Sequence, residues 1–99
     1  SIDSENINAL YGMGAYYVNK SNGYVQELNN LTLSQENKKA RQMIIDEMNK
    51  NFDKAIHYFD LLLKIDPDDQ STLIALKKIY EMKEDQVNVE KINEKIIAE

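Results

Sequence analysis

The chain contains no cysteine, which excludes disulfide bonds and thiol catalysis and leaves its redox compartment open. It has only one proline and three glycines among 99 residues. So few helix breakers favour helices with short connections. Its apolar runs are short, as at Ala15–Val18 and Leu61–Leu63. None approaches the roughly 18 apolar residues that span a bilayer, so we expect no membrane insertion.

Positive charge is also scarce, with 12 basic against 17 acidic residues and a net charge of −5. The basic stretch at Lys38, Lys39 and Arg41 is soon followed by Asp46 and Glu47, so no basic stripe forms. Nucleic-acid phosphates need a concentrated Lys/Arg face, and we therefore expect no nucleic-acid partner. Apolar residues make up 42 % and charged residues 29 %, which is typical of one soluble globular domain with a modest core.

Catalytic and metal-binding patterns are missing as well. His57 is the single histidine, and it lacks the further ligands that zinc needs, so we expect it on the surface. The sequence has no glycine-rich phosphate loop, no Ser/His/Asp set and no isolated carboxylate pair. We therefore predict no enzyme activity, no metal and no cofactor.

Two long stretches have the spacing of amphipathic helices. The first runs from about Ser4, which we expect as its N-cap, to Asn30. The second runs from about Gln35 to Ile65, with Ser34 as the expected N-cap. Its buried seam is predicted to be Ala40, Ile44, Met48, Phe52, Ala55, Phe59 and Leu62.

Two shorter helices follow. The segment from Asp66 to Asp69 ends the second helix, because Pro67 disfavours helical geometry in the residue before it. An aspartate after the proline can cap the third helix, predicted from about Gln70 to Lys83. After a polar turn at Glu84 and Asp85, the fourth helix is predicted to carry Val89, Ile92, Ile96 and Ile97.

One pattern occurs twice at a constant offset: Leu10, Met13 and Tyr17 recur as Leu73, Leu76 and Tyr80 (73 − 10, 76 − 13 and 80 − 17 all give 63). Ala55, Phe59 and Pro67 lie between the two occurrences. Large and aromatic residues on a first helix, small and aromatic residues on a second, and a proline at the exit are typical of a helix–turn–helix repeat. Gly14 and Ala55 are the small residues that we expect where the first two helices cross.

These residues resemble the tetratricopeptide repeat family, most closely at Leu10, Met13, Gly14, Tyr17, Ala55, Phe59 and Pro67. Val89 follows Ala55 at the family's period (89 − 55 = 34). The resemblance implies an all-α fold, an α-solenoid of helix–turn–helix units with four antiparallel helices. Lys77 and Asn93 depart from the family's pattern, so the last helix is expected to act as a solubilising cap.

The first unit is expected to be longer than the family's ordinary repeat. The offset from Tyr17 to Ala55 is 38 (55 − 17), whereas the offset from Tyr80 to Val89 is 9 (89 − 80), which leaves an insertion of 29 (38 − 9). Divided between two helices, this insertion adds about four turns to each and predicts an elongated first hairpin. The single domain then divides into a first repeat at 4–67, with its insertion at about 20–50, and a second repeat at 70–99.

This layout also resembles the C-terminal portion of exported repeat proteins of Bacteroidetes. The resemblance favours an exported or periplasmic location over the cytoplasm. The chain begins at Ser1, and it is either a mature exported protein or a cut piece of a longer one.

By the same resemblance, a concave groove is lined from the first helix of each unit. The corresponding residues are Asn8, Tyr11, Ala15, Val18, Ser71, Ile74, Lys78 and Glu81. Tyr11, Ala15 and Ala75 stand where a clamp for a C-terminal carboxylate would need polar residues, so we predict no such clamp. A more apolar and aromatic groove favours an extended or helical peptide.

We therefore predict a non-catalytic scaffold that binds a peptide or protein segment through this groove. The alternative is a structural module, in which the chain forms a homodimer or docks onto neighbouring repeats of a longer protein. The first helix leaves both interpretations open because Tyr11, Met13, Tyr16 and Tyr17 point to several sides of it. Such a surface can bind a partner, or it can pack against upstream repeats or a second copy.

Overall fold

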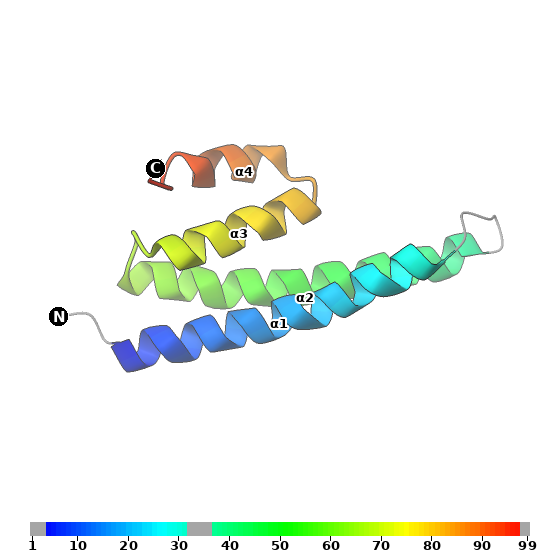
Figure 1. Cartoon of the computed structure of the whole chain (residues 1–99), viewed down its shortest axis with the longest axis horizontal. Coiled ribbons are helices and arrows are strands. Elements are labelled where there is room, and N and C mark those ends of the chain that lie inside the picture. The colour runs from blue at the N-terminus through cyan, green and yellow to red at the C-terminus, as the bar shows by residue number, and fades with distance from the viewer. Residues whose placement is uncertain (1–3, 32–36, 98–99) are drawn as a thin grey trace.

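The fold consists of helices that run back and forth. The structure is a computed structural model and describes residues 4–31 and 37–97. This part forms α1 (Ser4–Asn30), α2 (Lys38–Ile65), α3 (Gln70–Met82) and α4 (Gln86–Asn93), and it contains no strand (Figure 1). The prediction of an all-α fold is confirmed.

The predicted helix boundaries agree with the structure within a few residues. α1 and α3 begin and end within one residue of their predicted bounds. α2 begins at Lys38, and the predicted N-cap Ser34 lies outside the described residues. Asp69 stands at the N-cap of α3, but its carboxylate accepts a hydrogen bond from the Thr72 hydroxyl at 2.7 Å and not from a backbone N–H.

α4 is shorter than predicted, since it ends at Asn93 and excludes Ile96 and Ile97. The side chain of Gln70 explains this end. Its carbonyl oxygen accepts a hydrogen bond from the Ile97 N–H at 2.9 Å, and its amide donates to the Lys95 carbonyl at 3.4 Å. These bonds hold the last described residues beside the start of α3 and take the place of further helical bonds.

α1 and α2 form the first hairpin, which is much longer than the second hairpin of α3 and α4. They have 27 and 28 residues, against 13 and 8 for α3 and α4. At about 1.5 Å per residue, α2 is about 42 Å long. The end of α1 at Asn30 and the beginning of α2 at Lys38 therefore extend past α3 and α4, and we call these two helix ends the distal arm (Figure 1). The molecule measures 55 × 26 × 19 Å.

Small residues of α1 allow α2 to approach. Gly14 is buried, and a Cβ atom built on it would lie only 2.4 Å from Cε1 of Phe59. One heptad further along, the Ser21 hydroxyl is fully buried and donates to the Met48 carbonyl at 3.0 Å. As the α1 numbers rise the α2 numbers fall, which fixes the antiparallel register. Ala55 is also fully buried.

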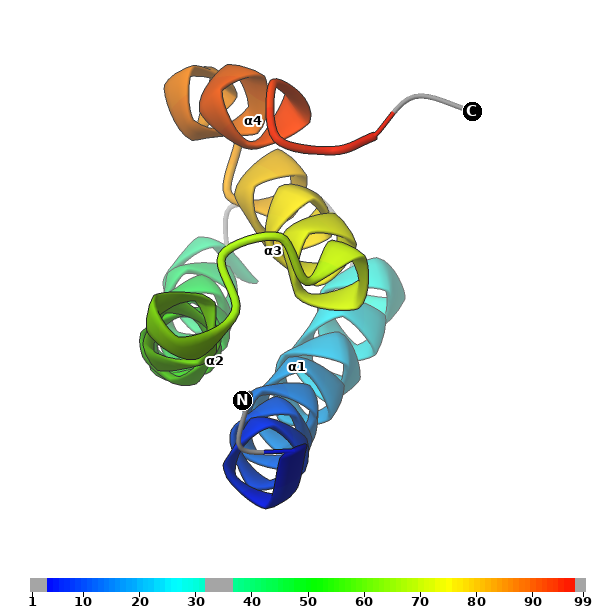
Figure 2. The ribbon, with the colours of Figure 1, turned by 90° about the vertical axis from the view of Figure 1, so that its left-hand side faces the viewer.

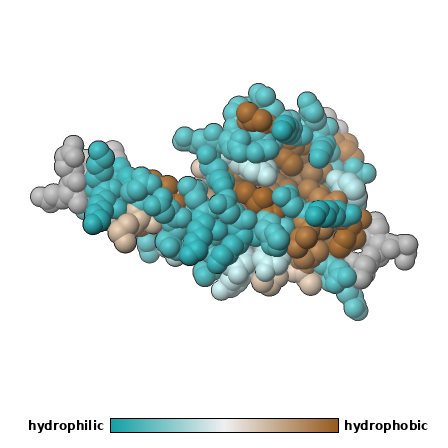
Figure 3. Space-filling model, turned by 180° about the vertical axis from the view of Figure 1, so that it is seen from behind, coloured by the Kyte–Doolittle hydropathy of each residue, from teal (hydrophilic) through white to brown (hydrophobic). Residues whose placement is uncertain are grey.

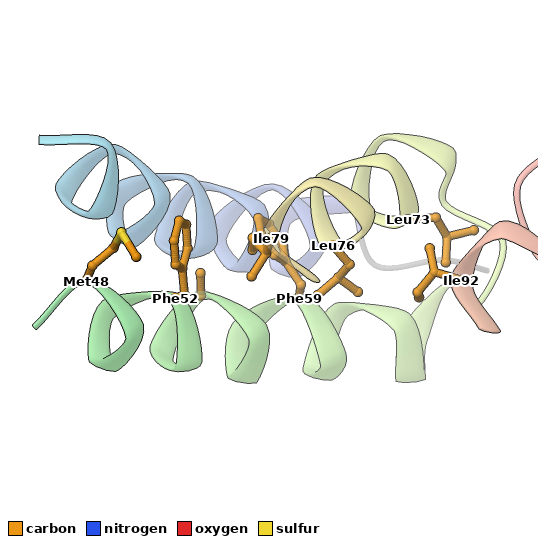
Figure 4. Packing of buried hydrophobic residues seen from close by; sticks show 8 residues of the cluster. Met48, Phe52, Phe59, Leu73, Leu76, Ile79 and Ile92 are labelled. Carbon is orange, nitrogen blue, oxygen red and sulfur yellow. The ribbon is translucent and has the colours of Figure 1, made fainter. Parts of the chain in front are cut away.

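The core lies where the second hairpin packs on the first. Figure 2 looks along the hairpin and shows α3 over the pair formed by α1 and α2, with α4 beyond α3. In Figure 4, Met48, Phe52 and Phe59 rise from α2, and Leu73, Leu76 and Ile79 come from α3. Each large apolar side chain buried there stabilises the fold by about 1.5–3 kcal/mol. The predicted seam of α2 is buried from Met48 to Leu62, whereas Ala40 is exposed and Ile44 half-buried in the distal arm.

Some of the residues that carry the repeat pattern lie outside this core. Phe59, Leu73 and Leu76 are buried, while Leu10, Tyr17 and Tyr80 are half-buried, and Pro67 is exposed in its turn. Met13 belongs both to the repeat pattern and to the first-helix residues for which packing and partner binding were left open, and it is 39 % exposed. The helix turns by about 100° per residue, so Met13 lies about 100° around α1 from the buried Gly14 and on the side away from α3.

A left-handed residue joins α3 to α4. Glu84 has φ 58°. Around it the Asp85 N–H donates to the Tyr80 carbonyl at 2.9 Å, and the Glu84 N–H donates to the Glu81 carbonyl at 3.1 Å. These are the two bonds of a Schellman C-cap, whose left-handed position usually holds glycine. Asp85 then serves as the N-cap of α4, where its side chain accepts from the Asn88 N–H at 3.3 Å.

Candidate functional site

An open groove of about 390 Å³ runs between α1 and α3, with the side chain of Phe52 at its base on α2. We call it the α1–α3 groove. Its walls come from residues 11–22 of α1 and 71–82 of α3, about three helical turns on each side. The lining residues are Tyr11, Val18, Asn22, Phe52, Ser71, Ile74, Ala75, Lys78, Ile79, Glu81 and Met82.

The groove forms because α3 sits to one side of the first hairpin. Residues on α1 at spacings of three and four share one face, so Tyr11, Val18 and Asn22 point to the same side of that helix. α3 turns Leu76 and Ile79 toward α2, which leaves Ile74 and Lys78 facing α1. The two helices therefore present facing walls with a shared apolar base.

The rim of the groove is apolar and exposed. Tyr11, Ile74 and Met82 are 36 %, 43 % and 44 % exposed, and they lie along one groove, where a contiguous apolar surface is typical of an interaction site. Tyr11 is held in place by its contact with the buried ring of Phe59, at 5.6 Å between ring centroids. A rigid aromatic side chain of this kind makes a good interface anchor because it loses little entropy on binding.

Most of the residues predicted from the sequence meet in this groove. Six of them line it: Tyr11, Val18, Ser71, Ile74, Lys78 and Glu81. Asn8 lies in an adjoining hollow of about 260 Å³ together with Ile7, Tyr11, Asp69 and Ser71. Ala15 is half-buried and is not among the residues that line these two hollows.

Sequence reasoning missed four lining residues, namely Asn22, Phe52, Ile79 and Met82, and it named Ala75 only as a position of the carboxylate clamp. Asn22 and Met82 continue the predicted positions Val18 and Lys78 by four residues, so one more helical turn of the same pattern would have found them. Phe52 was expected only in the buried seam of α2. Phe52 and Ile79 are buried side chains whose atoms also reach the groove floor.

At the opposite junction, between α2 and the second hairpin, a basic side chain meets acidic side chains. Lys83 at the end of α3 pairs with Asp53 of α2. Burial raises the pKa of Tyr80, and the carboxylates of Asp60, Asp85 and Asp53 raise it further. This junction therefore brings acidic side chains of α2 against the second hairpin.

Two other features bear on chemistry. His57 is exposed and its ring makes an edge contact with Tyr58, with 5.3 Å between centroids. Within the part of the chain that the structure describes, no three His, Asp or Glu side chains gather as they would around a metal ion. None of the described helices has the length and apolarity needed to cross a membrane.

The chain was compared with protein-family models, with curated proteins and with solved structures, and none of them matches it. The candidate site therefore rests on its own geometry.

Proposed function

We propose that the chain is a non-catalytic interaction module that binds a peptide or protein segment in the α1–α3 groove. The observation that carries this proposal is the exposed apolar rim formed by Tyr11, Ile74 and Met82 over an apolar base. Polar side chains, here Asn22 and Lys78, border this apolar surface. An apolar surface with polar groups at its edge is the usual composition of a protein interface. The rigid helical walls mean that little order has to be gained on binding.

We further propose that the architecture is of the tetratricopeptide type. Three features support it: a small residue, Gly14, lies against the aromatic Phe59; Leu73 and Leu76 are buried at the positions that repeat Leu10 and Met13; and α3 packs across the first hairpin. In such a stack the first helices of successive units face one groove, which is the position of α1 and α3 here.

The groove is tested by selecting peptides that bind the chain from a random displayed library. Ile74→Lys places a charge in the centre of the apolar rim, and it should weaken the selected peptides at least tenfold. Met43→Lys is the matched control, because Met43 is 61 % exposed on the distal arm and does not line the groove. Binding that survives Ile74→Lys, or that is lost equally in Met43→Lys, would show that the groove is not the site.

A second candidate function is structural, with the chain associating with further helical units or with itself. Met13 and Tyr16 favour it, because they are 39 % and 53 % exposed on the side of α1 that points away from α3. Alanine substitution of Tyr11 and Ile74 in the groove, compared with alanine substitution of Met13 and Tyr16 on the opposite side of α1, separates the two functions. Loss of peptide capture at unchanged oligomeric state supports groove binding, and loss of self-association alone supports the structural role.

A further inference from the structure

Outside the α1–α3 groove, exposed apolar side chains gather at the two ends of the helix stack. Met13 and Tyr16 lie on α1, and Val87 and Ile97 lie on α4 or just after it, 63 % and 70 % exposed. These two helices are the outermost layers in Figure 2. On the face seen in Figure 3, the apolar surface gathers over the half of the molecule that holds both chain ends, and most of the distal arm is hydrophilic.

The first of these surfaces, which we call the α1 outer face, consists of Leu10, Met13, Tyr16, Tyr17 and Lys20. Contacts among the side chains of this face already hold them in place. The rings of Tyr16 and Tyr17 meet edge to face at 5.1 Å, and the Lys20 ammonium lies 5.5 Å from the centre of the Tyr16 ring. The face is therefore aromatic and basic, and it loses little entropy when it is covered.

α2 extends this face with the same character. Tyr58 stacks on Tyr17 with parallel rings 5.9 Å apart, and the Lys54 ammonium lies 5.3 Å from the centre of the Tyr17 ring. Both side chains line a hollow of about 320 Å³ together with Tyr17, His57 and Asp53, whose carboxylate is paired with Lys83. A partner of this surface would thus meet aromatic rings flanked by two lysines.

The chain contains a template for how this face is covered. Its residues recur at the constant offset of the repeat: Leu10, Met13, Tyr17 and Lys20 correspond to Leu73, Leu76, Tyr80 and Lys83 (83 − 20 = 63). In α3 this set packs on the first hairpin, with Leu76 only 1 % exposed and Lys83 paired with Asp53. In α1 the corresponding Met13 is 39 % exposed. α1 therefore carries the same kind of residues that pack α3 on the first hairpin, but no hairpin of the described chain packs on them.

α4 offers a complementary surface on the opposite end. Val87 and Glu94 correspond to Asp53 and Asp60 of α2 at the offset of one repeat (87 − 53 and 94 − 60 both give 34). Those two aspartates lie on the side of α2 that faces the second hairpin. Val87 and Glu94 lie on the equivalent side of α4, which faces outward from the second hairpin. We define the α4 outer face as Val87, Glu90, Glu94 and Ile97, all exposed. It combines two apolar side chains with two carboxylates, and it is thus the electrostatic complement of the α1 outer face.

We propose that the α4 outer face of one copy docks on the α1 outer face of a second copy and continues the helix stack. The contact repeats between molecules the apolar packing that α3 makes on the first hairpin within one molecule. Val87 stands where Asp53 pairs with Lys83, so Glu90 and Glu94 supply the carboxylates that meet Lys20. The contact joins surfaces at opposite ends of the helix stack, so each added copy lengthens the stack and leaves a free surface at either end (Figure 2). This contact between copies uses no residue of the α1–α3 groove, so its test does not depend on peptide binding in the groove.

Light scattering over a wide concentration range tests the proposal. The average mass should rise continuously with concentration and fall when salt screens the lysine–carboxylate pairs. A monomer at every concentration overturns the proposal. A plateau at twice the monomer mass overturns it as well, because a closed dimer needs a self-complementary surface.

Two blocked variants give the sharper test. Tyr16→Gln with Lys20→Glu removes the α1 outer face, and Val87→Gln with Ile97→Gln removes the α4 outer face. All four residues are exposed, so both variants should keep the wild-type helix content and thermal midpoint. Each alone should be monomeric, and an equimolar mixture should form a 1:1 complex and grow no further. Growth of either variant alone, or a mixture that stays monomeric while wild type assembles, refutes the head-to-tail contact.

Discussion

The contact between Gly14 and Phe59 makes a sharp prediction for the substitution Gly14→Ala. A methyl group at this position would lie 2.4, 2.6 and 2.7 Å from three carbons of the Phe59 ring. Carbon atoms normally approach to about 3.5–4.0 Å, so the ring would have to retreat by about 1 Å. It has little room, since Phe59 is 1 % exposed and also touches Tyr11. The substitution should therefore force α1 and α2 apart.

The magnitude follows from two opposing effects. Alanine in place of glycine inside a helix stabilises it by about 1 kcal/mol. Overpacking a filled core costs about 1–3 kcal/mol, and the deep overlap at Gly14 argues for the upper end of that range. The net result is a loss of about 2 kcal/mol. For a domain of this size, that lowers the thermal midpoint by about 8–16 °C.

Two other glycines of α1 provide the controls. A Cβ at Gly12 or Gly23 would meet no atom within 4 Å, so their alanine variants should only gain helix propensity, about 0.5–1 kcal/mol. Urea unfolding of the three variants measures the difference directly. If Gly14→Ala is stabilised as much as Gly12→Ala, the close packing of α1 on α2 described above is wrong. Phe59→Leu should rescue Gly14→Ala with a coupling of at least about 1 kcal/mol.

Three further predictions concern the turn between α3 and α4 and the core. Glu84→Gly should raise the free energy of unfolding by about 0.5–1 kcal/mol, because glycine adopts the left-handed backbone at φ 58° without strain, whereas Glu84→Ala should bring no gain in the same urea titration. Hydrogen bonds from the side chain and backbone of Asn88 hold the pKa of Asp85 below its usual range. The Asp85 carboxylate therefore stabilises the fold at pH values above the ordinary aspartate pKa, and this contribution is lost as pH falls through the lower pKa of the folded state. Asp85→Asn should thus be less stable than wild type at neutral pH, and unfolding curves recorded down the pH scale should converge; a gap that persists in acid would contradict the role of the charge. Phe52→Ala should cost about 3–5 kcal/mol in thermal unfolding, while Met43→Ala on the exposed surface should change stability by less than about 0.5 kcal/mol.

Helix positions could be predicted from the sequence because they depend on local pattern. The spacing of Leu73, Leu76 and Tyr80 and the proline at 67 define α3 without knowledge of the rest of the fold. The groove positions, in contrast, were those that the resemblance to the tetratricopeptide family implies. Tyr11 and Ile74 accordingly lie on facing walls.

The remaining features depend on contacts between residues far apart in the sequence. Met13 has the apolar character of a core residue, and its exposure follows from the side on which α3 packs, which α1 alone does not encode. The end of α4 at Asn93 depends on the side chain of Gln70, which reaches backbone groups 25 and 27 residues away. The role of Phe52 in the groove floor likewise required the position of α3.

The most direct test of the central claim is the map of backbone amide chemical shifts when a library-selected peptide is added to the wild-type chain. Peptide binding in the α1–α3 groove predicts that the shifts concentrate on residues 11–22 of α1 and 71–82 of α3, the two walls of the groove. The distal arm and α4 should remain unchanged at saturation. Shifts that gather on α4 or on the distal arm, with residues 71–82 unaffected, would contradict the proposed function.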